Sequence, residues 1–168
     1  MMGWGLAAAL LVLALDQASK WWILSGLDLP ARQRVHVLPF VDFTMVWNQG
    51  VTFGLFQQGG HWGPWVLAAI ALLVVALLVA WMRRAERAWT ACALGAIAGG
   101  AVGNIIDRLR FGAVEDFIHL HAGGFSWYVF NVADAAVVCG VAALVLESLL
   151  PRPAGAGPNG LRAGADRR

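Results

Sequence analysis

The sequence predicts an all-α membrane protein with four transmembrane helices and a small extracytoplasmic β-rich part. Of its 168 residues, 60% are hydrophobic and 13% are charged, whereas a soluble domain is about half apolar and a quarter charged. A helix needs about 20 mostly apolar residues to cross the hydrocarbon core of a bilayer. Four windows meet this requirement, namely residues 4–24, 62–82, 88–109 and 130–150.

Arginine sets the predicted orientation of these spans. The link at residues 83–87 contains three arginines, and the segment after residue 150 contains four more. Short cytoplasmic segments carry an excess of basic residues, so both are predicted to be cytoplasmic. With four spans, both termini then lie inside, and residues 25–61 and 110–129 lie outside. Tryptophans near both ends of the spans fit the aromatic belts of membrane proteins.

Outside the spans, the composition changes twice. Residues 35–56 are rich in β-branched and aromatic side chains, with a turn-like Asn48-Gln49-Gly50 in the middle, so we expect a small sheet there, on or near the membrane. Residues 151–168 are mostly Pro, Gly, Ala and Arg without periodicity. We expect one domain over residues 1–150 and a disordered cytoplasmic tail. The sequence has no cluster of basic residues of the kind that would predict nucleic-acid binding.

Polar residues inside the spans are costly and suggest function. Asp16 and Lys20 lie four residues apart on the first helix and can pair, which could also serve only to hold helices in register. The third span carries small residues at a spacing of four, which allows another helix to approach closely. They are Gly95, Gly99 and Gly103. Its outer end places Asn104, Asp107 and Arg108 on one face, an arrangement more typical of a scaffold than of a catalyst.

Two further acids lie in the loop between the third and fourth spans and in the first turn of the fourth helix. Taken singly, Asp116 is a loop carboxylate, and Asp134 supports a helix start capped by Asn131. Because the loop is short, both acids should lie near the outer surface. Two carboxylates in one site share a proton. One can then activate a water while the other donates to a carbonyl. That chemistry suits peptide hydrolysis and needs no metal, cofactor or nucleophilic side chain.

Five segments stand in order along most of the chain: DQASK at 16–20, NQGVTFG at 48–54, GGAVGNIIDR at 99–108, VEDF at 114–117 and FNVAD at 130–134. Together they resemble the lipoprotein signal peptidase family, also called signal peptidase II. The family has four membrane helices, an extracytoplasmic β-cradle and a short extracytoplasmic helix. One position departs from the pattern, because Glu115 stands where the family more often has an apolar residue.

The resemblance implies a membrane aspartyl protease of the bacterial cytoplasmic membrane, with its active site at the outer face. Such enzymes cut the signal peptide from a prolipoprotein just before its diacylglyceryl-modified cysteine. The implied partners are lipidated prolipoproteins and membrane lipid, and we expect a monomer. Asp116 and Asp134 would be catalytic. The supporting residues would be Asp16, Lys20, Asn48, Gly54, Asn104, Asp107, Arg108 and Asn131. We expect the acyl chains to lie in grooves near the small-residue face of the third span.

Other classes remain open at this point. A proton-coupled transporter or channel subunit would spread its acids along a path through the membrane, whereas here only Glu147 is predicted near the inner side. A scaffold subunit would tolerate replacement of Asp116. A metal site at His119, His121 and Asp116 would rest on a single His-x-His, which is a weak signal. The Gly-x-Gly-Asp motif of another class of intramembrane protease does not occur in the sequence.

Overall fold

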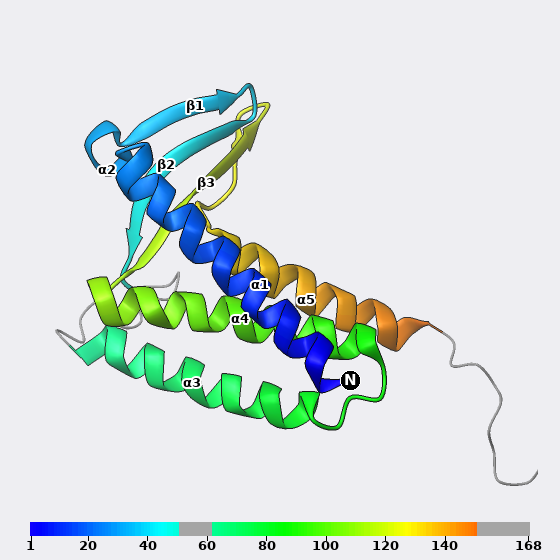
Figure 1. The fold of residues 1–168 in the computed structure, drawn as a ribbon. Coiled ribbons are helices and arrows are strands. Elements are labelled where there is room, and N and C mark those ends of the chain that lie inside the picture. Colours follow the sequence, from blue (N-terminus) through cyan, green and yellow to red (C-terminus); the bar gives the residue numbers. More distant parts are fainter. Residues whose placement is uncertain (51–61, 151–168) are drawn as a thin grey trace, which may run out of the picture.

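The computed structural model describes residues 1–50 and 62–150. Four long helices in this part of the chain are long and apolar enough to cross a membrane, which confirms the predicted spans to within a few residues at each end. A π-helical turn, η1 (Trp22–Gly26), continues the first of them. The four helices are α1 (Met2–Trp21), α3 (Gly63–Met82), α4 (Ala88–Phe111) and α5 (Val132–Leu149) (Figure 1).

Helix α4 is the centre of the bundle and contacts α1, α3 and α5. Half of its apolar window is buried, against 11% in each of the other three spans. Its glycines allow this contact, since a methyl group at Gly99 would overlap the backbone of Ala9 on α1, and one at Gly95 would overlap Gly5. The predicted small-residue face therefore exists and α1 covers it. The α1 backbone fills the space directly over Gly95 and Gly99, so a groove for acyl chains near this face would have to lie beside α1.

A four-stranded antiparallel sheet lies at one end of the bundle, in the order β1-β2-β3-β4. The predicted extended segment forms a hairpin that reverses at Pro39-Phe40, not at Asn48–Gly50, where the second strand ends. The third strand was not predicted, and Asp116 lies on it instead of in a loop. The strands are β1 (Arg34–Leu38), β2 (Val41–Asn48), β3 (Val114–Ala122) and β4 (Phe125–Ser126).

A buried apolar cluster fixes the sheet over the end of α1. It joins Ile23 of η1 and Leu29 of the short helix α2 (Leu29–Arg32) to Met45 of β2 and Phe117 of β3. Because Phe117 is held in this cluster, its neighbour Asp116 faces the opposite side of the strand. The cluster thus sets the height at which β3 delivers Asp116 above the helix ends.

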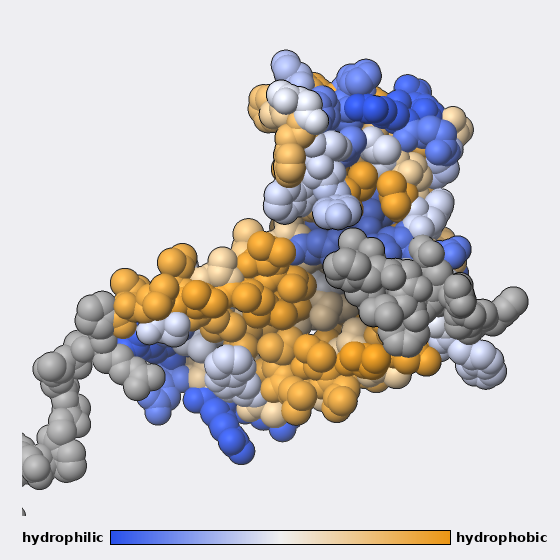
Figure 2. All heavy atoms as spheres, turned by 180° about the vertical axis from the view of Figure 1, so that it is seen from behind, coloured by the Kyte–Doolittle hydropathy of each residue, from blue (hydrophilic) through white to orange (hydrophobic). Residues whose placement is uncertain are grey.

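The hydropathy of the surface changes where the helices meet the sheet. On the face that Figure 2 shows, hydrophobic residues cover most of the helices, while hydrophilic residues gather over the sheet. This is the pattern of a bundle surrounded by lipid with a sheet outside the hydrocarbon core. Residues 51–61, including the predicted site residue Gly54, and the predicted disordered tail 151–168 lie outside the described residues.

Candidate active site

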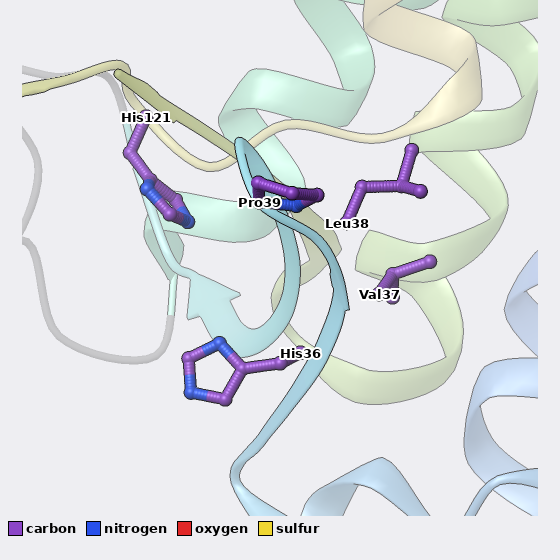
Figure 3. A pocket seen from close by; sticks show the side chains of 5 residues that line it. All are labelled: His36, Val37, Leu38, Pro39 and His121. Atoms are coloured by element: carbon purple, nitrogen blue, oxygen red, sulfur yellow. The ribbon is translucent and has the colours of Figure 1, made fainter. Parts of the chain in front are cut away.

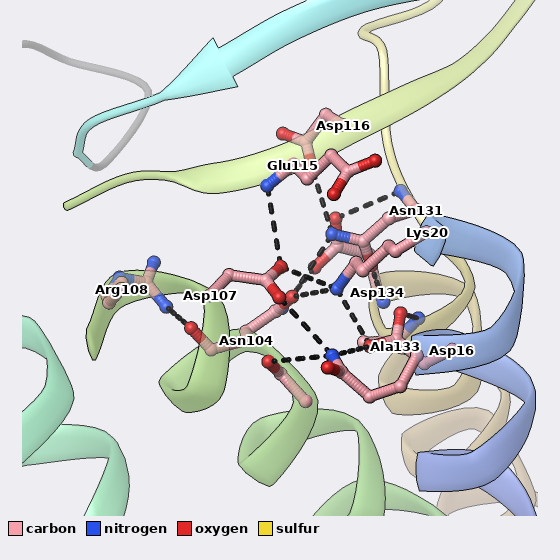
Figure 4. A network of polar contacts seen from close by, with 12 residues as sticks. Asp16, Lys20, Asn104, Asp107, Arg108, Glu115, Asp116, Asn131, Ala133 and Asp134 are labelled. Atoms are coloured by element: carbon pink, nitrogen blue, oxygen red, sulfur yellow. Dashed lines mark hydrogen bonds and ion pairs between the residues drawn. The ribbon is translucent and has the colours of Figure 1, made fainter. Parts of the chain in front are cut away.

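The polar residues singled out in the sequence meet where β3, α4, α5 and the end of α1 come together (Figure 4). Asp116 comes from β3 and is 2% exposed. Asn48 donates to its Oδ2 at 3.0 Å, and Asn131 donates to its Oδ1 at 2.8 Å. Burial, reinforced by the charge of Asp134, raises the pKa of Asp116 to about 7, although the two amide hydrogen bonds oppose the shift.

Asp134 lies in the first turn of α5. Its backbone N–H donates to Asn131 Oδ1 at 2.8 Å, and its Oδ2 accepts from the Asn131 N–H at 3.3 Å, so the two residues form a capping box. The predicted helix-start role is therefore present. The other carboxylate oxygen accepts from Asn104 Nδ2 at 2.8 Å. Capping leaves Asp134 oriented toward the same network that holds Asp116.

Asn131 links the two carboxylates. It is fully buried, and its Nδ2 donates both to Asp116 Oδ1 and to Asn104 Oδ1, the latter at 3.0 Å. Its backbone N–H donates to Asp134, so one residue contacts both acids. Because Asn104 also contacts Asp134, the pair is held by shared amide donors that fix its geometry.

Beneath the pair lies a buried group that we call the ionic cluster, formed by Asp16, Lys20 and Asp107. Lys20 Nζ lies 2.7 Å from Asp16 Oδ2 and 2.6 Å from Asp107 Oδ2, and all three residues are at most 3% exposed. Asp16 Oδ1 accepts from the Ala133 N–H at 3.0 Å, at the start of α5. The cluster therefore ties α1, α4 and α5 together directly below Asp134.

Sequence reasoning anticipated the pairing of Asp16 with Lys20 but not the second carboxylate. It also missed Gln17, whose Nε2 donates to Asp16 and to Asp107, both at 3.2 Å. Gln17 stands within the first family-like segment, so a signal was present. Lys20 also reaches toward the pair, with Nζ 3.4 Å from Asn104 Oδ1.

Arg108 adds positive charge beside the acids. Its Nη1 donates to the Asn104 carbonyl oxygen at 3.2 Å. The guanidinium interacts with the charges of Asp134, Asp107 and Asp116. Its buried Nε has no hydrogen-bond partner among the residues that the structure describes. Arg108 thus brings a fixed cation and a spare donor to the edge of the pair.

A second polar group lies away from this site, at the edge of the sheet. A pocket of about 480 Å³ is lined there by residues including His36 and His121 (Figure 3). Burial opposes ionisation of Asp42, but hydrogen bonds from Arg34 and His36 outweigh it and lower the pKa of Asp42 to about 2. Within residues 1–50 and 62–150, no group of three or more His, Cys, Asp or Glu could hold a metal ion.

Comparison with known proteins identifies the family to which the chain belongs. The family model described as signal peptidase (SPase) II matches residues 8–150. The chain belongs to the signal peptidase II family. The match spans the network from Asp16 to Asp134, so the site lies inside the part of the chain that defines the family. The protein is a bacterial multi-pass membrane protein of an aspartic endopeptidase family.

Relatives and solved structures agree. The lipoprotein signal peptidase of Methylorubrum extorquens (strain PA1) is 58% identical over 149 residues, covering 89% of this chain and 87% of the relative. That of Rhodopseudomonas palustris (strain ATCC BAA-98 / CGA009) is 44% identical, covering 92% and 96%. A solved bacterial membrane enzyme, determined by the in meso method at 1.9 Å resolution, aligns with a TM-score of 0.76 and 25% identity, covering 89% of this chain and 95% of that structure.

Proposed function

We propose that this protein is a membrane aspartyl endopeptidase that removes the signal peptide from diacylglyceryl-modified prolipoproteins, cutting before the lipidated cysteine. Asp116 and Asp134 form the catalytic pair. The observation that carries the proposal is that two carboxylates from different elements are bound by the same residue, since the side-chain amide of Asn131 donates to Asp116 and its backbone N–H donates to Asp134, in a chain of this family. Cleavage of a lipidated peptide by the purified protein tests it.

In this mechanism the pair shares one proton before the substrate is cut, and burial raises the pKa of Asp116 to about 7, which favours its protonated form. The ionised partner takes a proton from a water as the water oxygen attacks the scissile carbonyl carbon. The protonated acid gives its proton to the carbonyl oxygen. Collapse of the tetrahedral intermediate breaks the C–N bond: the leaving nitrogen takes the proton that the water gave up, and one hydroxyl of the intermediate returns its proton to the first acid, which restores the shared proton.

The supporting residues divide into two layers. Asn48, Asn104 and Asn131 donate to the pair and fix the orientation of both carboxylates. The ionic cluster holds α1 to the end of α4 and to the start of α5, so its role is to keep the pair in place. Arg108 provides a cation that stabilises the negative charge developing on the substrate.

The placement of acids argues against the transporter alternative. The pair and the ionic cluster gather at one end of the bundle (Figure 4). Glu147 lies near the other end of α5, where both of its oxygens accept from Thr90, at 2.9 and 2.8 Å. A proton path would need titratable groups between these ends. The described acids form no such series, and the peptidase accounts for their clustering.

We expect both termini and the link at residues 83–87 to face the cytoplasm, with the catalytic pair at the outer face, because of the arginine bias. Single cysteines at Ala85 and Ala122, in a chain whose free Cys92 and Cys139 are replaced, report each side. An impermeant thiol reagent applied to intact cells should label Ala122→Cys only. Labelling of Ala85→Cys from outside would reverse the topology.

We also expect the lipid on the substrate to be required for efficient cleavage. The pair lies where the sheet meets the helix ends, so a scissile bond must be held at that depth. A signal peptide alone can shift along its apolar stretch at small cost. Acyl chains fix the depth, since each buried methylene contributes about 0.8 kcal/mol. Removing the diacylglyceryl group should lower kcat/KM by about 100-fold or more. Equal values for both peptides would indicate a general membrane peptidase.

A further inference from the structure

Glu115 is a buried acid for which the proposed chemistry has no use. It precedes Asp116 on β3, and neighbouring strand residues point to opposite faces. Asp116 faces Asn48 and Asn131, whereas Glu115 faces the ends of α1 and α4. It is 0% exposed, and neither carboxylate oxygen has a hydrogen-bond partner among the described residues. A buried polar group without a partner is costly and calls for a reason.

The surroundings of Glu115 decide its charge. Helix α1 contributes Asp16 and Lys20, helix α4 contributes Asp107 and Arg110, and β2 places Trp47 opposite Glu115 in the sheet. Lys20 is already bound to two carboxylates, so an ionised Glu115 would be a third acid around one ammonium. Burial, followed by the charge of Asp107, raises the pKa of Glu115 to about 8. Glu115 is therefore mostly neutral at pH 7.

We propose that Glu115 is a positioning residue for the catalytic pair, a neutral buried acid that separates β3 from the ionic cluster and so fixes where the strand delivers Asp116. This inference rests on the proposed function. The backbone carries the effect, because the Glu115 N–H donates to Asp107 Oδ2 at 3.4 Å, one residue before Asp116. A negative charge on Glu115 repels Asp107, loosens this link and shifts Asp116 relative to Asp134.

The first readout is stability, which does not depend on cleavage. The pKa of Glu115 rises from 4.5 to about 8 on folding. A raised pKa means that the folded state binds the proton more tightly than the unfolded state. The stability that protonated Glu115 contributes is therefore full below pH 4.5 and is lost as the pH rises to 8. Glu115→Gln stays neutral throughout. Its Tm in detergent, minus that of the parent, should be smallest near pH 4.5, increase up to pH 8 and stay level above it.

The matched control is Glu86→Gln, which makes the same change at an exposed position on the link between α3 and α4. Its Tm difference from the parent should not vary over this range. A Tm difference for Glu115→Gln that stays flat from pH 4.5 to 8 would overturn the neutral-acid assignment, whatever the activity of the protein.

The second readout is the pH profile of kcat/KM on a diacylglyceryl-modified peptide. Loss of the shared proton at Asp116 gives every variant one alkaline ionisation, and Glu115 gives the parent a second. The logarithm of kcat/KM should therefore fall with a limiting slope near two per pH unit in the parent and near one in Glu115→Gln. At pH 9 the variant should exceed the parent by about tenfold, one pH unit above the second ionisation. Equal slopes would overturn the proposal.

Glu115→Ala separates positioning from simple neutrality. It is also neutral, but it leaves the space between β3 and the ionic cluster empty. At pH 6, its kcat/KM should be at least about tenfold below that of Glu115→Gln, mainly through kcat, because a small displacement of a reacting group is costly. Equal kcat for the two variants would overturn positioning. A parent that follows the expected Tm series but does not cleave the peptide would instead refute the proposed function.

Discussion

Replacing Asp116 by Asn should abolish cleavage and at the same time stabilise the fold. The amide cannot exchange the shared proton, so kcat/KM should fall by about 1,000-fold or more. The pKa of Asp116 rises from 3.8 to about 7 on folding, so the stability that its protonated form provides is lost as the pH rises between these values. At pH 8 the free energy of unfolding of the Asn variant should therefore exceed that of the parent by an amount on the order of a few kcal/mol, so the variant should unfold at a higher temperature.

Asp134→Asn should lose activity to the same extent while keeping α5 intact, since an amide oxygen can still accept from the Asn131 N–H. The control is Asp28→Asn, an identical change at an exposed residue before α2. It should leave both cleavage and Tm unchanged. For each of the three variants, turnover of the lipidated peptide measures activity and thermal unfolding measures stability. Near-parental activity in either Asp116→Asn or Asp134→Asn would remove that residue from the catalytic role.

Lys20→Met should produce the largest loss of stability. Lys20 is the only lysine in the chain, and its ammonium is the cation that pairs with both Asp16 and Asp107 in a buried site. Removing one partner of a buried ionic group typically costs 3–5 kcal/mol, because the remaining charges stay desolvated and unpaired, so we expect a loss of about that size. Thermal unfolding in detergent should show it directly.

Two further variants show whether the loss of stability comes from unpaired charges in the ionic cluster. Arg84→Met removes an exposed charge on the link between α3 and α4 and should change the Tm little. Combining Lys20→Met with Asp16→Asn and Asp107→Asn leaves a neutral cluster, which should recover much of the loss. If Lys20→Met alone unfolds at the temperature of the parent, the ionic cluster does not hold the helices together.

The sequence predicts local features of this protein well. Runs of apolar residues identify all four spans, and spacing alone pairs Asp16 with Lys20. A short connection brings Asp116 and Asp134 to the same end of the bundle. These inferences depend on neighbours along the chain or on the length of one loop.

Contacts between distant segments were not predicted. Strand β3 exists because it pairs with β2, about 70 residues earlier in the chain. Asp107 reaches Lys20 because glycines let α1 and α4 approach to backbone contact, and spacing within either helix does not reveal their relative register. The burial of Glu115 follows from both, since it lies between that strand and that helix pair.

The pairing of Lys20 with a carboxylate on its own helix affects how the chain enters the bilayer. During synthesis α1 emerges well before α4, so Asp107 is not yet available when the first helix meets lipid. Asp16, one turn before Lys20, can neutralise the ammonium at that stage and lower the cost of inserting two charges. When α4 arrives, Asp107 joins the pair and Asn104 comes within reach of Lys20. The bond that lets α1 insert alone thus becomes the base on which the later helices assemble.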